Sequence, residues 1–238
     1  MYSYPSFGVN SYFYKETSMA KKEQKSAMYF VEDEETAKIR DWWKKNGTAI
    51  IVGLVVGVGA VAGYQGWNMY KMQQAESASN LYQKMLRSLE ADSLSAVRSD
   101  ADQIIEKYSS TAYVDAALLM LGKLNFDAGR IQDADAVLSR VMNESKDSGV
   151  RHIARLRRIA IAIDSENLNL AEELLNVEQA VGFESRYDEF RGDLSVARGD
   201  IDKAREAYTR AFELSPPGSV SAQILGRKIN RVSRAADL

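Results

Sequence analysis

Residues 191–217 read RGDLSVARGDIDKAREAYTRAFELSPP, and this stretch decides the fold. Gly192 and Ala204 are small residues that let two helices cross closely, and Tyr208 is large enough to fill the space beside them. Gly199 suits a tight turn between the helices, and Pro216 cannot continue a helix. The segment therefore predicts a pair of antiparallel helices that ends near residue 216.

The same pattern recurs at the period of a helical repeat. Four alanines open similar helical stretches at spacings of 33, 37 and 33 residues: Ala101, Ala134, Ala171 and Ala204. The tetratricopeptide period is about 34 residues. Around Ala134 the small and large positions are Gly122 and Leu138. The sequence predicts an all-α, tetratricopeptide-like helical-repeat solenoid over residues 71–238.

Two of the four units match the pattern less well. The unit around Ala171 has Arg158 where Leu is usual and lacks a turn glycine, and the first helix of the unit around Ala101 is offset. The unit around Ala101 is the first of the four, and terminal repeats are often atypical because they cap the stack. After Pro217 a final helix carries Leu225 on an apolar face, and we expect it to cover the end of the solenoid.

Residues 46–70 contain no charged residue, and their centre reads TAIIVGLVVGVGAVAGYQGW over residues 48–67. Twenty residues of helix span about 30 Å, which is the thickness of the hydrocarbon layer of a bilayer. Aromatic residues flank both ends, as membrane-interface anchors do: Trp42, Trp43, Tyr64, Trp67 and Tyr70. The segment predicts a single transmembrane helix that contacts the lipid bilayer.

Glycines in this segment form two small-xxx-small pairs: Gly53, Gly57, Gly59 and Gly63. Such pairs allow another membrane helix to pack closely, although glycine is also simply common in membrane helices. An alternative to a permanent membrane anchor is that the segment is a signal peptide, because Ala60–Ala62 resembles a signal-peptidase site. Cleavage after Ala62 would release a soluble repeat protein.

Basic residues set the expected orientation. Lys38, Arg40, Lys44 and Lys45 precede the apolar segment, whereas only Lys71 follows it closely. This excess predicts a cytoplasmic N-terminus and a translocated C-terminal domain. Residues 1–45 are then a cytoplasmic tail with a short acidic helix at 32–45. We expect residues 1–27 to have no fold of their own or to precede the natural start, because Met19 and Met28 are alternative starts.

The composition narrows the function. The chain of 238 residues has no Cys and a single His, which excludes disulfides, thiolate sites and multi-histidine metal sites. Residues 71–238 carry 23 Lys/Arg and 26 Asp/Glu, so nucleic acid is not an expected partner. His152 has no partner at a catalytic spacing and is expected on a helix surface. We therefore expect no catalytic residues, no metal and no cofactor, and a protein that is not an enzyme.

A helical-repeat solenoid offers a concave groove that binds extended or helical peptides. By the repeat register, the first helices of three units supply candidate groove residues: Leu119, Lys123, Phe126, Leu156, Ala160, Ile163, Glu189, Asp193 and Val196. A basic cluster at residues 151–158 and another at 227–234 either contact an acidic partner or form solvated faces.

Several segments carry a resemblance to a known family. DWWKKNG at residues 41–47, GYQGWNMY at 63–70, ESASNLYQKML at 76–86 and the repeat quoted above resemble the ancillary SecYEG translocon subunit family over about residues 28–238. The resemblance implies a bacterial inner-membrane protein with periplasmic repeats. It also implies association with the SecYEG channel and the membrane-anchored periplasmic chaperone PpiD, assisting emerging polypeptides.

The sequence thus predicts a membrane-anchored, non-enzymatic adaptor. The alternatives are an envelope assembly scaffold that does not take part in secretion and the soluble periplasmic protein released by cleavage.

Overall fold

A computed structural model describes residues 12–236, and these residues form helices and turns without a strand. The all-α expectation is confirmed. The chain divides into two compact units, residues 1–69 and residues 70–238. The helices are α1 (Tyr12–Glu90), α2 (Leu94–Lys107), α3 (Tyr113–Asp127), α4 (Ile131–Glu144), α5 (Ser148–Asp164), α6 (Leu168–Leu175), α7 (Glu184–Ala197), α8 (Ile201–Glu213) and α9 (Val220–Ala236).

Helix α1 is continuous, which differs from two expectations. Residues 12–27 are helical, and the helix does not stop at Lys45; residues 1–11 of the expected unfolded tail lie outside the described residues. Residues 12–46 contain neither Gly nor Pro, so nothing local interrupts the helix. At the expected break, Asn46 Nδ2 donates to the Trp42 carbonyl at 3.0 Å, and the Trp43 indole lies against Gly47.

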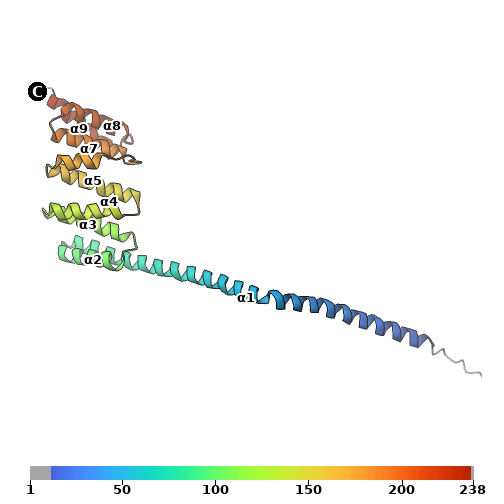
Figure 1. The fold of residues 1–238 in the computed structure, drawn as a ribbon. Coiled ribbons are helices and arrows are strands. Elements are labelled where there is room, and N and C mark those ends of the chain that lie inside the picture. Colours follow the sequence, from blue (N-terminus) through green and yellow to red (C-terminus); the bar gives the residue numbers. More distant parts are fainter. Residues whose placement is uncertain (1–11, 237–238) are drawn as a thin grey trace, which may run out of the picture. The chain divides into compact units, whose positions relative to one another are not determined.

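Within residues 70–238, helices that are neighbours in sequence form pairs. The last turns of α1 pack with α2, and α3 with α4, α5 with α6, and α7 with α8 form three further helix pairs. Figure 1 shows α2 to α9 stacked pair upon pair along one direction. We number these pairs as the first to fourth repeat units, and the tetratricopeptide-like expectation is confirmed.

The turn inside each unit has one residue in the left-handed region. These residues follow one another at spacings of 37, 37 and 33: Asp92, Gly129, Glu166 and Gly199, with φ values of 55°, 71°, 59° and 79°. At each turn the next residue donates its N–H to a carbonyl five residues back, at 2.8–2.9 Å. This closure satisfies the last carbonyls of the first helix. Only two of the four turns use glycine, so a search for glycine finds half of them.

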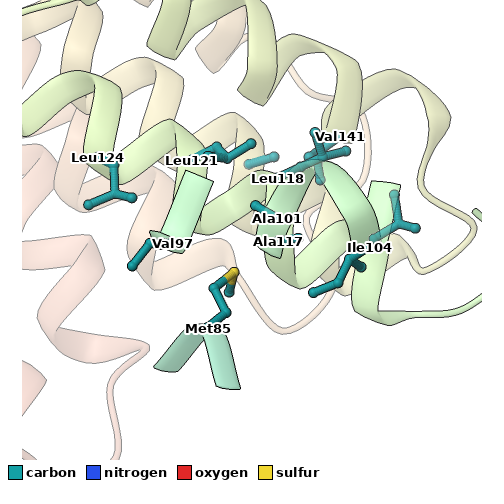
Figure 2. Close-up of a cluster of buried hydrophobic side chains, with 11 residues drawn as sticks. Met85, Val97, Ala101, Ile104, Ala117, Leu118, Leu121, Leu124 and Val141 are labelled. Carbon is teal, nitrogen blue, oxygen red and sulfur yellow. The ribbon is translucent and has the colours of Figure 1, made fainter. Parts of the chain in front are cut away.

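Buried side chains join the four repeat units through a series of hydrophobic clusters. Figure 2 shows the first cluster, in which Met85 of α1 meets Val97, Ala101 and Ile104 of α2, and leucines of α3 lie behind them. All of these are under 10% exposed. Further clusters continue through α4, α5 and α7 to α9, where Leu225 is fully buried. This burial makes the stack of helices cohesive.

Small residues at the helix crossings have large neighbours. A Cβ on Gly122 would lie 2.8 Å from the Leu138 side chain, and one on Gly192 would lie 2.4 Å from the Tyr208 ring. The opening alanines of the second helices are fully buried: Ala101, Ala134, Ala171 and Ala204. The backbones of paired helices therefore approach more closely than larger side chains would permit.

Candidate peptide-binding groove

A cavity of about 460 Å³ lies between the second and third repeat units. We call it the α3–α5 groove. Helices α3 and α5 form its sides, and Leu138 of α4 contributes from beneath. Its lining comprises Gly122, Lys123, Phe126, Asp127, Leu138, Arg157, Ala160, Ile161 and Asp164.

The α3–α5 groove combines an apolar floor with charged sides. Leu138 and Ile161 are under 8% exposed, whereas Lys123 and Arg157 are exposed. Lys123 pairs with Asp127, and the Arg157 Nη1 donates to the Leu119 carbonyl at 2.9 Å. An apolar floor with flanking charges is suited to a peptide that buries one side chain and pairs others.

The repeat register brings three of the nine candidate residues into this groove. Lys123, Phe126 and Ala160 line it, and Leu119 and Ile163 lie half-buried next to it against the core. The groove prediction omitted Asp127, Ile161 and Asp164, and it placed Arg157 only in the basic cluster. The two aspartates are 37 residues apart and end equivalent helices, so the repeat period itself was the signal that could have found them.

Two candidates are not accessible to a partner. Leu156 is 7% exposed and belongs to the core between α5 and α7, and Glu189 is 5% exposed. The Glu189 carboxylate pairs with Arg186 and with the Lys228 ammonium at 2.9 Å. Both were expected to face the groove, but their helices present these positions to a neighbouring helix instead.

Asp193 holds α9, the helix that covers the C-terminal end of the stack. Its carboxylate accepts hydrogen bonds from the Tyr208 hydroxyl at 2.7 Å and from the Lys228 ammonium at 2.6 and 2.8 Å. Burial, together with the bond to Asp193, raises the pKa of Tyr208, so the phenol remains protonated. Val196 and Asp193 line a smaller cavity of about 270 Å³ between α7 and α9. In the fourth unit, α9 thus occupies part of the surface expected to be open.

The basic cluster at residues 151–158 divides among three environments because its members point in different directions around α5. Arg158 is buried and pairs with Asp135, and Arg157 reaches the α3–α5 groove. Arg151 and Arg155 line a different cavity. The cluster is therefore not one continuous basic face.

His152 is partly buried and contacts two aromatic residues, although it was expected to be a plain surface residue. Its Nδ1 lies 2.8 Å from the Tyr187 hydroxyl, and its ring stacks on Phe183 at 5.0 Å between centroids. Burial, followed by the charges of Arg155 and Arg151, lowers the pKa of His152. Within the described residues, no three His, Asp or Glu side chains converge in a way that suits a metal ion.

Residues of the apolar part of α1 are exposed in the absence of a bilayer. Among the described helices, α1 alone is long and apolar enough to cross a membrane. Nothing lies within 4 Å of a Cβ built on Gly53, Gly57, Gly59 or Gly63. The aromatic side chains Trp42, Trp43, Tyr64, Trp67 and Tyr70 are 50–68% exposed. Trp43 and Tyr64 are separated by about 32 Å of helix, which matches a bilayer core.

The stacked helix pairs, with a groove between two of them, make this chain a helical-repeat protein. A family model described as a tetratricopeptide repeat-like domain matches residues 40–234. Three curated relatives are each named as an ancillary SecYEG translocon subunit. The one from Haemophilus influenzae is 31% identical over 84% of this chain and 97% of its own length. Those from Escherichia coli and Neisseria gonorrhoeae are 24% identical over 87% and 86% of this chain and 98% of their own lengths.

This chain therefore belongs to the tetratricopeptide repeat-like family and, within it, to the family of ancillary SecYEG translocon subunits. No solved structure matches it.

Proposed function

We propose that the protein is a membrane-anchored, non-enzymatic adaptor of the SecYEG translocon. The observation that carries the proposal is the combination, in one chain, of a helix able to cross a membrane and a repeat stack with an open groove. The relatives that share nearly their whole length with this chain are named as translocon subunits, which supports the same partner.

The finer parts of the proposal follow from the sequence. The basic residues before the apolar segment favour a cytoplasmic N-terminus and a periplasmic repeat domain. In a bacterial inner membrane, the span would pack beside the translocon through Gly53, Gly57, Gly59 and Gly63. The repeat domain would then bind the membrane-anchored chaperone PpiD or an emerging polypeptide near the channel exit.

The α3–α5 groove is the surface we assign to that contact. Lys123 is exposed at its side and Phe126 lies half-buried within it, so a peptide there would gain both an ionic and an apolar contact. Helix grooves of this composition bind peptides by anchoring a few side chains.

Site-specific photo-crosslinking in native membranes tests the proposal. A photoreactive phenylalanine replaces Lys123 in the groove, Gly59 in the span or, as the matched control, exposed Gln132 on α4. We expect adducts with a translocon subunit from Gly59 and with PpiD or a nascent chain from Lys123, and few from Gln132. Adducts restricted to subunits of another envelope complex would replace the proposal with the assembly scaffold, and no adduct from Gly59 and Lys123 would overturn it.

A further inference from the structure

Two arginines of α5 that have no ion pair among the described residues, Arg151 and Arg155, line a cavity outside the α3–α5 groove. A cavity of about 440 Å³ opens between the N-terminal half of α5, the end of α4 and the loop that joins α6 to α7. We call it the basic pocket. Its lining comprises Met142, Ser148, Gly149, Arg151, His152, Arg155, Gln179, Val181 and Phe183.

None of the nine lining residues is acidic. In the described part of the chain, neither Arg151 nor Arg155 has a carboxylate within ion-pair distance, whereas Arg158 on the same helix is paired with Asp135. The hydrogen bond that fixes Arg151 runs from Nη1 to the Ser145 carbonyl at 2.8 Å. This bond orients the guanidinium without neutralising it. Two uncompensated cations one helical turn apart thus face one cavity.

The wall opposite the arginines is aromatic and apolar. Phe183 stacks on His152, and His152 is in turn held by the hydroxyl of the fully buried Tyr187. Val181 is 78% exposed, and the partly buried Met142 also lines the cavity. The wall is therefore fixed by packing, while one apolar side chain remains open to a ligand.

The lowered pKa of His152 agrees with this electrostatic environment. Burial contributes most to the shift, and Arg155 and Arg151 contribute next, against a smaller opposing effect of Glu184. Burial lowers the pKa of a histidine without any charge nearby, so only the contributions of Arg155 and Arg151 reflect a positive potential in the pocket. The same potential favours the binding of an anion.

From this geometry we infer that the basic pocket binds an acidic peptide segment of a partner protein, in which a carboxylate side chain stands beside an apolar one. The guanidinium groups of Arg151 and Arg155 bind the carboxylates, because a planar fork of N–H donors matches the two oxygens. The apolar neighbour packs on Val181 and Phe183. This surface is separate from the α3–α5 groove, so the inference does not rest on the proposed translocon association.

An anionic lipid headgroup would offer similar oxygens, but the repeat domain as a whole disfavours it. Residues 71–238 carry a net charge of −3, so an anionic membrane surface repels the domain while a small acidic peptide is attracted by the local potential alone. The apolar wall also gives a headgroup nothing to bury.

The natural absence of cysteine makes the pocket easy to observe. The full chain with Val181→Cys is labelled with an environment-sensitive fluorophore and placed in phosphatidylcholine nanodiscs. The probes are acetyl-GELELG-amide and the matched neutral peptide acetyl-GQLQLG-amide. We expect the acidic peptide to shift the fluorescence saturably, the neutral peptide to fail, and added salt to weaken the binding.

Variants then assign the binding to the arginines. Arg155→Gln and Arg151→Gln should each weaken binding of the acidic peptide by about tenfold. Arg227→Gln, at an exposed arginine on α9, is the matched control and should bind as the parent does. Circular dichroism melting confirms that each variant is folded, and calorimetry on the unlabelled chain confirms that the fluorophore does not create the site.

Three results would overturn the inference. The first is equal binding of the acidic and neutral peptides, and the second is unchanged binding in both Arg151→Gln and Arg155→Gln. The third is a fluorescence response to nanodiscs of equal parts phosphatidylcholine and phosphatidylglycerol without any response to the peptide, which would make the ligand a lipid. None of these results bears on crosslinking to the translocon from the span or the groove.

Discussion

The Arg158 guanidinium on α5 donates two hydrogen bonds to the Asp135 carboxylate on α4, from Nε to Oδ1 at 2.7 Å and from Nη2 to Oδ2 at 3.0 Å. The pair joins the second repeat unit to the third. The Arg158 side chain is 9% exposed and that of Asp135 is 31% exposed. A position that is apolar in the usual repeat is thus filled here by a charged residue with a dedicated partner.

Removing the acid should leave the arginine buried and unpaired. We expect Asp135→Asn to lower the free energy of unfolding by about 2 kcal/mol, less than for a fully buried pair because Asp135 is partly exposed. Replacing both residues with apolar ones, Asp135→Leu with Arg158→Met, should restore most of the loss. Urea denaturation of the full chain in detergent, followed by circular dichroism, measures both. Asp135→Asn as stable as the parent would contradict this role.

The close crossing of α7 and α8 leaves no room for a methyl group. A Cβ at residue 192 would lie 2.4 Å from two carbons of the Tyr208 ring, and the Tyr208 hydroxyl is held by Asp193. We expect Gly192→Ala to destabilise the protein by about 2–3 kcal/mol. Gly226→Ala is the matched control, because nothing lies within 4 Å of a Cβ there, and it should be neutral or slightly stabilising. Equal changes in melting temperature in the two variants would show that the α7–α8 crossing does not require a glycine at residue 192.

The turns that contain Glu166 and Gly129 should respond in opposite ways to substitution. Both residues are in the left-handed region, which disfavours side chains with a Cβ. Glu166→Gly should stabilise the protein by about 0.5–1 kcal/mol, and Gly129→Ala should destabilise it by about 1 kcal/mol. Thermal denaturation measures both changes, and a loss of stability in Glu166→Gly would show that the glutamate side chain has a compensating contact.

Acidification should weaken the fourth unit's contact with α5 through His152. Burial lowers the pKa of this histidine in the folded state, so near its ordinary pKa of 6.5 the unfolded chain binds more protons than the folded one. Its contribution to stability is therefore complete above pH 6.5 and is lost as the pH falls below that value. His152 is the chain's single histidine, so His152→Gln should flatten the pH dependence of urea denaturation between about pH 7 and 5.5. An unchanged slope in the variant would exclude this assignment.

The orientation of the membrane helix can be measured because the chain has no cysteine of its own. We expect a membrane-impermeant maleimide to modify Gln132→Cys in intact spheroplasts and Glu35→Cys only after lysis. The reverse labelling pattern would show the opposite topology.

The intact mass of the purified protein decides the cleavage alternative, since release after Ala62 requires a chain that starts at Gly63.

Local patterns in the sequence were enough to predict the repeat architecture. Ala134, Ala204, Gly192 and Tyr208 mark the helix crossings, and the apolar face of the last helix marks the end of the stack. The turn at Glu166 was not visible as a turn, because a left-handed residue there need not be glycine. The charge pattern predicts a short helix at 32–45 after a tail without a fold, whereas the absence of Gly and Pro from residues 12–46 favours the longer helix that is observed.

The site was less predictable, because groove exposure depends on the rotation of each helix and on what covers it. The repeat register predicts both Leu156 and Lys123 for the groove, but Leu156 points into the core while Lys123 is exposed. The burial of Glu189 depends on Lys228, which is 39 residues away on α9. Such long-range contacts leave no periodic trace in the sequence.

The bonds from Lys228 to Asp193 and Glu189 also bear on assembly between copies of the chain. A repeat stack whose last unit is open can accept the first unit of another copy, and such head-to-tail contacts extend into filaments. Here α9 buries Leu225 and Val232 against α8 and is fastened by an ion pair to α7. Growth at that end would require the whole helix to leave, so α9 blocks the addition of another copy's repeats to the C-terminal end of the stack.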